Sequence, residues 1–434
     1  MDTIENRTFD EIKVGDTASL VRTLMGEDFE VFGMWGGALI STLLGTKLPG
    51  PGTIYVEQTL RFRRPVSIGE AITASVTATF KDPATHRVIL ECRCVNQSGE
   101  VVIDGIAEVI APAEKVRRPR AILPTVHLHD RGARYRQLIA LTRGLEPLRT
   151  AVVHPVDRNS LVGAIDAAKA GLIAPVLVGP EARIRGVAAA ESVDLAPYQL
   201  ISTRHSHEAT ERAVAMARTG EVEALMKGSL HTDELMQEVV AKESGLRTGR
   251  RISHVFVVDV PTYARPLFIT DAAINIAPNL DAKRQIVQNA IDLARVLGVE
   301  TPRVAILSAI ETLNPEIQST IDAAALCKMA ERKQITGGIL DGPLAFDNAV
   351  SEEAAKVKGI ESPVAGKADI LVVPDLESGN MLAKQLEYLG EAQLAGIVLG
   401  ARVPIVLTSR ADSPLARMAS CALALLFARR GPKY

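Results

Sequence analysis

The chain of 434 residues predicts an α+β domain of antiparallel strands followed by a larger α/β unit built on a mostly parallel sheet. Three observations carry this prediction. Residues 53–110 mostly alternate in a period of two, which is typical of half-buried antiparallel strands. After about residue 150, apolar residues come in short continuous runs, which are typical of strands buried on both faces. Helical segments such as 281–297 separate these runs, and repeated strand–helix order favours a parallel sheet.

In the first domain, expected at 1–113, an apolar helix with many small residues is predicted at 34–44. The Pro-Gly-Pro-Gly segment at 49–52 ends it, and four antiparallel strands follow within 53–110. We expect the sheet to wrap around the helix, with Trp35, Phe62, Cys92 and Cys94 packed in the core. The basic stretch 114–145 is read as a linker with one helix.

The second unit is expected at 146–434, with an inserted subdomain at about 261–402. Its buried strands are predicted from apolar runs at 150–155, 175–179, 223–225, 255–258, 304–307, 369–374 and 404–407.

Composition excludes several classes of protein. Apolar residues make up 47% of the chain and charged residues 23%, as in globular proteins. The formal net charge of -2 gives no overall attraction to nucleic acid or to an anionic membrane. No run of about 20 apolar residues and no basic, then apolar, leader is present, so we expect a cytoplasmic protein without a membrane span. The cysteines are too few and scattered for a disulfide framework or a metal site: Cys92, Cys94, Cys327 and Cys421.

Polar residues directly follow three expected strands of the second unit, within 340–347, 373–380 and 407–413. Each set also precedes an expected helix, whose free N–H groups and positive dipole end favour a phosphate. Ser, Asp and Asn are ordinary N-caps as well, so each set alone could be structural.

Two basic segments could complete an anion site, 226–228 and 250–254. An Arg suits phosphate because its planar guanidinium can donate two hydrogen bonds to two oxygens. The alternative is a solvated basic turn, and His254 alone is more often a core or turn histidine than a catalyst. No metal signature, phosphate-binding Walker loop or Ser/His/Asp motif is found.

These segments together resemble the phosphate acetyl/butyryltransferase family over roughly residues 146–434. The matching residues, in order, are Met226-Lys227-Gly228, Arg250-Arg251-Ile252-Ser253-His254, Thr270-Asp271 with Asn275 and Pro278, Asp341 to Asp347, Asp375 with Gly379-Asn380 and Lys384, and Thr408-Ser409-Arg410. The Asp341–Asp347 and Ser409–Ser413 segments are more similar to the butyryltransferase branch.

The resemblance implies an isocitrate-dehydrogenase-like two-domain α/β unit that transfers a short acyl group, acetyl or butyryl, between coenzyme A and phosphate without a covalent enzyme intermediate. Ser409 and Arg410 would contact the acyl phosphate, and Arg250 or Arg251 would bind phosphate. Further substrate-binding positions implied by the matches are Lys227, Asp271, Asp341, Asn380 and Lys384.

The resemblance leaves the base for the CoA thiol unassigned. In the acetyl-specific branch a carboxylate about two helical turns after the Ser-Arg pair is the proposed base. This chain has Ala416 and Arg417 there, so Asp412 and Asp347 are the candidates that remain.

Residues 7–112 resemble MaoC-like hot-dog enoyl-CoA hydratases, through 33–41, 59–66 and Gly69-Glu70. That family carries an Asp-x-Asn-Pro-x-His motif before its central helix, whereas here 28–32 runs directly into the helix segment. We therefore expect a hot-dog module that lacks the hydratase acid/base pair.

The sequence thus favours a phosphate acyltransferase fused to an inactive hot-dog module. Two alternatives remain, a bifunctional hydratase/acyltransferase and a non-catalytic acyl-CoA-binding scaffold. Acyl-CoA and phosphate would be substrates, with no tightly bound cofactor or metal. We also expect a homo-oligomer, because one sheet on one helix leaves an uncovered edge strand and apolar surface.

Overall fold

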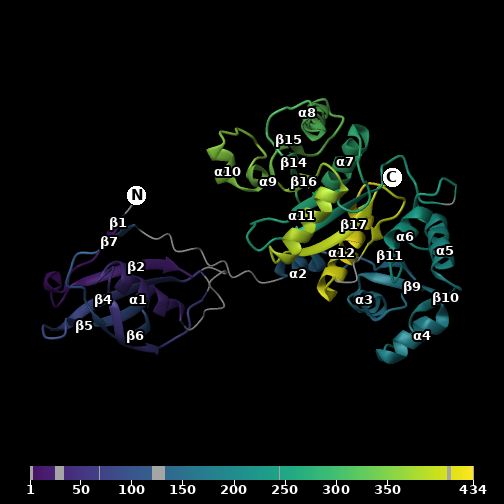
Figure 1. The fold of residues 1–434 in the computed structure, drawn as a ribbon. Coiled ribbons are helices and arrows are strands. Elements are labelled where there is room, and N and C mark those ends of the chain that lie inside the picture. Colours follow the sequence, from purple (N-terminus) through teal and green to yellow (C-terminus); the bar gives the residue numbers. More distant parts are fainter. Residues whose placement is uncertain are drawn as a thin grey trace. The chain divides into compact units, whose positions relative to one another are not determined.

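The computed structural model describes residues 3–24, 34–67, 69–119, 132–243, 245–407 and 412–433. The chain falls into two compact units, Met1–Asp130 and Arg131–Tyr434, called unit 1 and unit 2 (Figure 1). Each unit has its own hydrophobic core.

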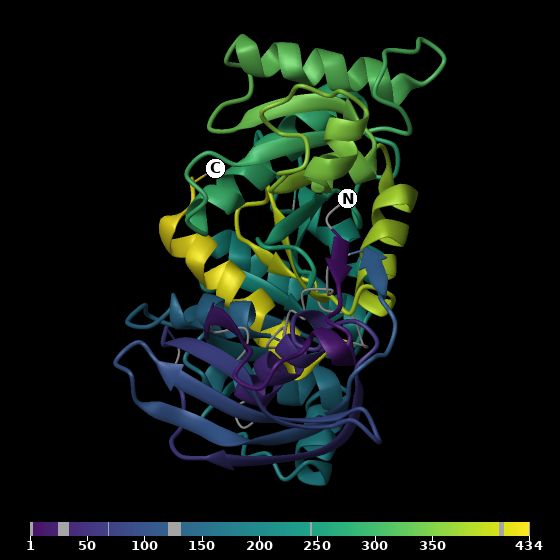
Figure 2. The ribbon, with the colours of Figure 1, turned by 90° about the vertical axis from the view of Figure 1, so that its left-hand side faces the viewer.

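Unit 1 is a five-stranded antiparallel sheet packed on one helix, the hot-dog fold (Figure 2). The strand order is β2-β4-β5-β6-β3, and a separate pair joins β1 to β7. The predicted helix and four antiparallel strands are confirmed, whereas β2 was missed because most of its residues are exposed. The elements are β1 (Thr3–Glu5), β2 (Thr17–Thr23), α1 (Trp35–Thr46), β3 (Ile54–Phe62), β4 (Ala71–Asp82), β5 (Arg87–Asn96), β6 (Val101–Ile110) and β7 (Arg117–Pro119).

The core of unit 1 forms where one face of α1 meets one face of the sheet. Leu43 and Leu44 of α1 are fully buried, and so are Cys92 and Cys94, two apart on β5. Burial raises the pKa of these thiols to about 11 and about 12, so both act as small packing groups. The expectation for Phe62 was wrong: it ends the edge strand β3, and 49% of it is exposed.

Unit 2 is built on an eleven-stranded sheet with the order β10-β9-β8-β11-β18-β17-β12-β13-β16-β14-β15. The predicted parallel pairing is confirmed in two blocks, β10-β9-β8-β11-β18 and β13-β16-β14-β15. Between them, β17 and β12 pair antiparallel with their neighbours. The strands are β8 (Leu148–Val153), β9 (Ile173–Gly179), β10 (Gln199–Ser202), β11 (Ala224–Lys227), β12 (Ser253–Asp259), β13 (Leu267–Thr270), β14 (Arg303–Leu307), β15 (Ile339–Leu344), β16 (Ile370–Val372), β17 (Gln393–Leu399) and β18 (Ile405–Val406).

The antiparallel steps reverse the direction of the second block. Because β18 to β17, β17 to β12 and β12 to β13 are all antiparallel, β13 runs opposite to β11. The carboxyl ends of the two blocks therefore lie at opposite edges of the sheet. An edge of the sheet is here the row of strand ends on one side, whereas an edge strand is an outermost strand. Polar residues that follow the strands are divided between these two edges.

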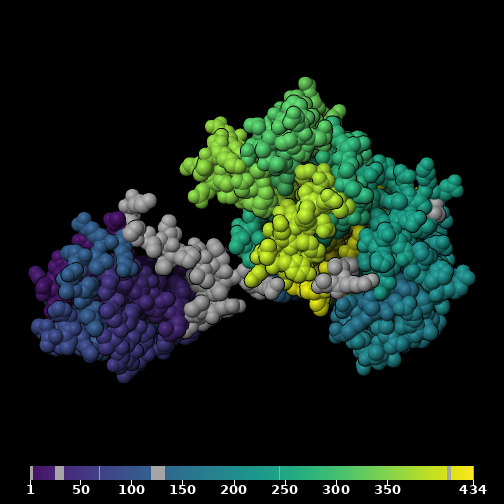
Figure 3. Space-filling model, in the orientation of Figure 1, coloured from purple at the N-terminus to yellow at the C-terminus, as the bar shows by residue number. Residues whose placement is uncertain are grey.

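Helices flank this sheet: α8 packs on β14 and β15, α9 packs on β14, and α10 packs on α9. This part of the chain is green in Figure 3. The most deeply buried helix is α12, which packs on β17, α2 and α3. No helix of the described residues is long and apolar enough to cross a membrane. The helices are α2 (Ala133–Ala140), α3 (Arg158–Lys169), α4 (Glu181–Ala190), α5 (Ser206–Thr219), α6 (Thr232–Val239), α7 (Leu280–Val296), α8 (Gln318–Glu331), α9 (Phe346–Val350), α10 (Glu352–Val357), α11 (Leu376–Tyr388) and α12 (Pro414–Arg430).

Candidate active site

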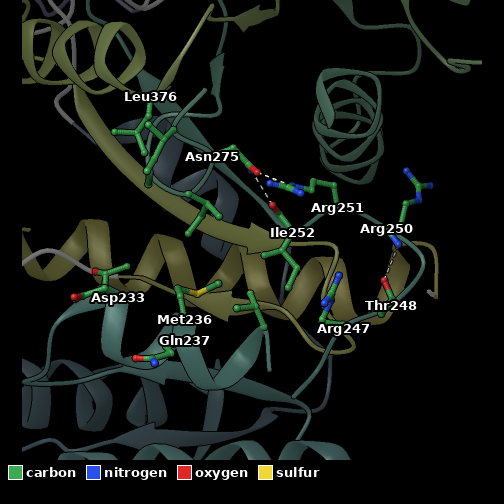
Figure 4. Close-up of a pocket in the computed structure, with 15 residues that line it drawn as sticks. Asp233, Met236, Gln237, Arg247, Thr248, Arg250, Arg251, Ile252, Asn275 and Leu376 are labelled. Carbon is green, nitrogen blue, oxygen red and sulfur yellow. Dashed lines mark hydrogen bonds between the residues drawn. The ribbon is translucent and has the colours of Figure 1, made fainter. Parts of the chain in front are cut away.

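A cavity of about 800 Å³ opens in unit 2 (Figure 4). Its walls are α6, the segment 247–252 before β12, the turn 273–276 after β13, and Leu376 at the start of α11. The charged residues of the lining are three arginines and one aspartate: Arg247, Arg250, Arg251 and Asp233. Apolar side chains cover much of the remainder: Met236, Val240, Ile252, Ile274, Ile276 and Leu376. The cavity thus combines a net positive charge with an apolar wall.

A chain of hydrogen bonds fixes Arg251 against the turn (Figure 4). Its Nε donates to Asn275 Oδ1 at 2.7 Å, and Asn275 Nδ2 donates to Asp271 Oδ2 at 2.6 Å. Asp271 is 3% exposed, and its Oδ1 accepts the N–H groups of Ala273 and Ile274. Burial raises the pKa of Asp271, against the opposing effect of these hydrogen bonds. Asp271 therefore acts on the cavity through Asn275.

Arg250 has a different partner. Its Nη2 lies 3.1 Å from Asp292 Oδ2 on α7, and its backbone N–H donates to Thr248 Oγ1. Burial raises the pKa of Asp292, opposed by its hydrogen bond from Gln288 and by the charge of Arg250. Arg251 instead bonds a neutral amide, so its positive charge is not offset by that partner. For this reason Arg251 is the better placed of the two to hold an anion.

Lys227 lies at the opposite edge of the sheet from Asp271, at the end of β11. It is 8% exposed, and its Nζ donates to the carbonyl of Leu230 at 3.1 Å. Because β18 is parallel to β11, the chain leaves β18 toward this same edge. Ser409 and Arg410 come after β18 in the sequence and lie outside the described residues. Asp412 lines a separate cavity of about 650 Å³.

The other predicted positions are spread over the second block. Asp341 was expected after a strand, but it lies within β15, where its Oδ1 accepts the N–H of Gly342. Asp347 is in the first turn of α9 and pairs with Lys358 at 3.4 Å. On α11, Asn380 donates to the carbonyl of Ala272, and Lys384 donates to Glu387. The N-cap reading is correct for Asp375, which accepts the N–H of Ser378.

The structure thus brings Arg250, Arg251 and Asp271 together. Sequence reasoning missed Arg247 as a site residue and did not assign a role to Asn275. The signal for Arg247 was its place four residues before Arg251, in the basic run Arg-Thr-Gly-Arg-Arg. Asn275 could be found only through contacts, because its role depends on a turn that brings it back to Arg251.

Comparisons with known proteins decide the family. The family described as "Phosphate acetyl/butaryl transferase" matches residues 203–425. A phosphate acetyltransferase from Rhizobium meliloti is 64% identical over 298 residues, covering 69% of this chain and 94% of that protein. The chain belongs to the phosphate acetyl/butyryltransferase family. It is therefore an acyltransferase.

Further relatives bear on the branch and the fold. A phosphate butyryltransferase from Clostridium acetobutylicum is 40% identical over 294 residues, covering 68% of this chain and 98% of that protein. A solved branched-chain phosphotransacylase from Enterococcus faecalis has a TM-score of 0.56 at 29% identity, covering 66% of this chain and all of that one. Higher identity to the acetyl-named relative does not support the butyryl-like reading of the two short motifs.

The one histidine among the described residues of unit 1, His86, lies in the turn between β4 and β5 and stacks on Phe9 with ring centroids 4.9 Å apart. Asp28 and Glu30 lie outside the described residues. No described cluster of three or more His, Cys, Asp or Glu side chains is arranged to hold a metal ion in either unit.

Proposed function

We propose that unit 2 binds acetyl-CoA in the arginine-lined cavity and transfers the acetyl group to inorganic phosphate. The observation that carries this placement is the set of three arginines, Arg247, Arg250 and Arg251, on one cavity. CoA carries several phosphate charges, and guanidinium groups bind phosphate oxygens in pairs. The apolar wall formed by residues such as Met236 and Ile274 suits the adenine ring and the pantetheine arm.

The reaction consumes no reactant beyond its two substrates. A phosphate oxygen attacks the thioester carbonyl carbon, the new C–O bond forms, and the C–S bond breaks with its electron pair leaving on sulfur. The proton of hydrogen phosphate ends on the thiolate. Negative charge grows on the carbonyl oxygen during attack. Each fixed hydrogen-bond donor at this oxygen raises the rate about 10²- to 10³-fold. Ser409 and Arg410 are proposed as these donors, and holding both substrates together supplies much of the remainder.

Acetyl is the proposed acyl group because identity to the acetyl-named relative, 64%, exceeds the 40% to the butyryl-named one. The measurement is kcat/KM for acetyl-CoA against butyryl-CoA, with release of CoA followed in the presence and absence of phosphate. Absence of phosphate-dependent release with either thioester would contradict the function itself.

The cavity is tested with Arg251→Ala and its conservative partner Arg251→Lys. Arg251→Ala removes hydrogen bonds between a charged guanidinium and phosphate, which contribute about 1.5–3 kcal/mol to binding. The KM for CoA should therefore rise about 10- to 150-fold. Arg251→Lys should recover part of this, because it restores the charge without the planar pair of donors. Arg185→Ala is the matched control, since Arg185 is exposed and pairs with Glu181 on α4. An unchanged KM in folded Arg251→Ala protein would exclude this cavity as the CoA site.

A further inference from the structure

The strand order of the first block reverses beside β8. From β8 the chain adds β9 and β10 on one side, and then places β11 on the other side of β8. In sheets of this kind, ligands bind outside the carboxyl ends of the strands at the point where the order reverses. The residues at that point are His154, directly after β8, and Lys227, Gly228 and Ser229 at the end of β11.

The backbone of His154 is held on both sides. Its N–H donates to the carbonyl of Val178 at 2.7 Å, and its carbonyl accepts the N–H of Ser229 at 2.9 Å. Its φ of 57° is left-handed, an uncommon conformation for a residue with a side chain. A Cβ on Gly228 would come within 2.3 Å of the Val153 carbonyl oxygen, so only glycine lets the two strand ends meet. The backbone of His154 is therefore held in place at the ends of β8 and β11.

The imidazole itself has no hydrogen-bond partner among the described residues. His154 is 5% exposed, and its Nδ1 is fully enclosed without a partner. The hydroxyl oxygen of Thr203, directly after β10 at the same edge, is also enclosed and has no hydrogen-bond partner among the described residues. Enclosed polar groups of this kind are rare and costly, and substrate-binding sites are one of the places that retain them.

Titratable groups from four neighbouring segments act on His154 electrostatically. They are Arg183 on α4, Glu234 on α6, Asp157 before α3 and His205 before α5. Burial and the charge of Arg183 lower the pKa of His154, while Glu234 and Asp157 oppose this. The ring is therefore neutral near pH 7 and able to accept a proton.

The arginine-lined cavity reaches the start of α6, close to the carboxyl end of β11. Thr232 and Asp233, at the start of α6, line the cavity together with the arginines beyond the other end of the helix. The helix has 8 residues and spans about 12 Å. Only two residues, Leu230 and His231, lie between Ser229 and Thr232, so the Cα atoms of these two are at most about 11 Å apart. CoA with its phosphates on the arginines can therefore extend its thiol arm along α6 toward His154.

Other described candidates are less well placed. Asp347 pairs with Lys358 and follows β15, the far edge strand of the second block. His254 is 1% exposed and packs against Phe256 with ring centroids 4.3 Å apart. Asp157 is already the N-cap of α3, where it accepts the N–H of Ser160 at 2.8 Å.

We propose that His154 is the acid–base residue that exchanges the proton of the CoA thiol. This inference rests on the proposed CoA placement. In the direction of acyl-CoA synthesis, neutral His154 takes the proton from sulfur, and the thiolate attacks the carbonyl carbon of the acyl phosphate. The C–S bond forms, the C–O bond to phosphate breaks, and the leaving phosphate takes the proton back from the imidazolium. The reverse direction uses the same steps in reverse order.

The test compares His154→Asn and His154→Gln with the wild-type chain in the synthesis of acetyl-CoA from acetyl phosphate. Asn is chosen because it tolerates left-handed backbone. Loss of a general base should lower kcat about 10²- to 10⁴-fold, with KM for CoA nearly unchanged. Arg185→Ala is the control, because Arg185 is exposed, pairs with Glu181 on α4 and has no part in the site, so kcat should stay at the wild-type value.

The pH profile supplies a readout that a merely structural role would not move. In wild-type protein, kcat/KM should fall as pH drops through the pKa of His154, below the ordinary value of about 6.5, because the protonated ring cannot accept the thiol proton. The variants should lose this acidic limb. If the variants fold and keep the kcat and the pH profile of the wild-type chain, the inference is wrong. If neither variant folds, a pH profile of the wild-type chain without an acidic limb would overturn it. A wild-type chain without acyl transfer would instead contradict the proposed function.

Discussion

The two units differ in where their enclosed polar groups lie. In unit 1 the buried Asn96 donates from Nδ2 to Glu70 Oε1 at 2.8 Å, and Gln58 Nε2, enclosed without a partner, lies within the edge strand β3. In unit 2, His154 and Thr203 enclose polar atoms without partners, and both directly follow parallel strands. Parallel strands gather their carboxyl ends at one edge, where polar groups from distant segments meet. An antiparallel sheet alternates the directions of its strands and so gathers no such set of carboxyl ends.

The largest expected effect is a loss of stability in unit 1 alone. Leu43 of α1 is fully buried in the core of unit 1, so Leu43→Ala should lower the free energy of unfolding of this unit by about 2.7–5 kcal/mol. Acyl transfer by unit 2 should be unchanged, because the two units have separate cores. Denaturant unfolding of the full chain, followed by circular dichroism and by activity, measures both quantities.

Ala38→Ser is the control for this variant, because Ala38 is exposed on the same helix and the change should stay within about 0.5 kcal/mol. A parallel loss of acyl transfer in Leu43→Ala would show that the two units do not act separately.

The next effect concerns Arg410, which comes after β18 in the sequence. Arg410→Ala should lower kcat by about 10²–10³, a loss of about 2.7–4 kcal/mol of transition-state stabilisation, because it removes a donor to the developing charge. The unfolding transitions of both units should stay as in the wild-type chain. Near-normal turnover in folded Arg410→Ala protein would remove Arg410 from the mechanism.

The smallest effect on activity concerns the edge of unit 1. The strand β3 ends the sheet, and Ile54, Tyr55 and Phe62 on it are 59%, 41% and 49% exposed. We expect a second copy of the chain to cover this edge, because an exposed apolar edge strand invites strand pairing. Light scattering at micromolar concentration should give a multiple of 46.5 kDa, and Phe62→Asp should shift it toward one chain without changing acyl transfer. A wild-type mass of one chain would contradict this expectation.

Local pattern predicted much of the fold. The period of two in 53–110 reflects one buried and one exposed face, and it correctly gave four antiparallel strands. Short strands with few distinctive residues were missed, among them β10 and β13. The antiparallel orientation of β17 and β12 between the two parallel blocks was also missed. The apolar pattern of a strand buried on both faces does not indicate the direction in which the strand runs.

For the site, the sequence by itself determined which charged groups are available. The run Arg247 to Arg251 and the polar residues after the strands can be read without a structure. Only the tertiary structure decided that Asp271 supports Arg251 through Asn275, while Lys227 lies at the opposite edge of the sheet. The physical reason is that charge and side-chain type are properties of single residues, whereas strand order and direction depend on contacts between distant segments. The meeting of His154 with Ser229 depends in this way on the pairing of β8 with β11, some 75 residues apart in the chain.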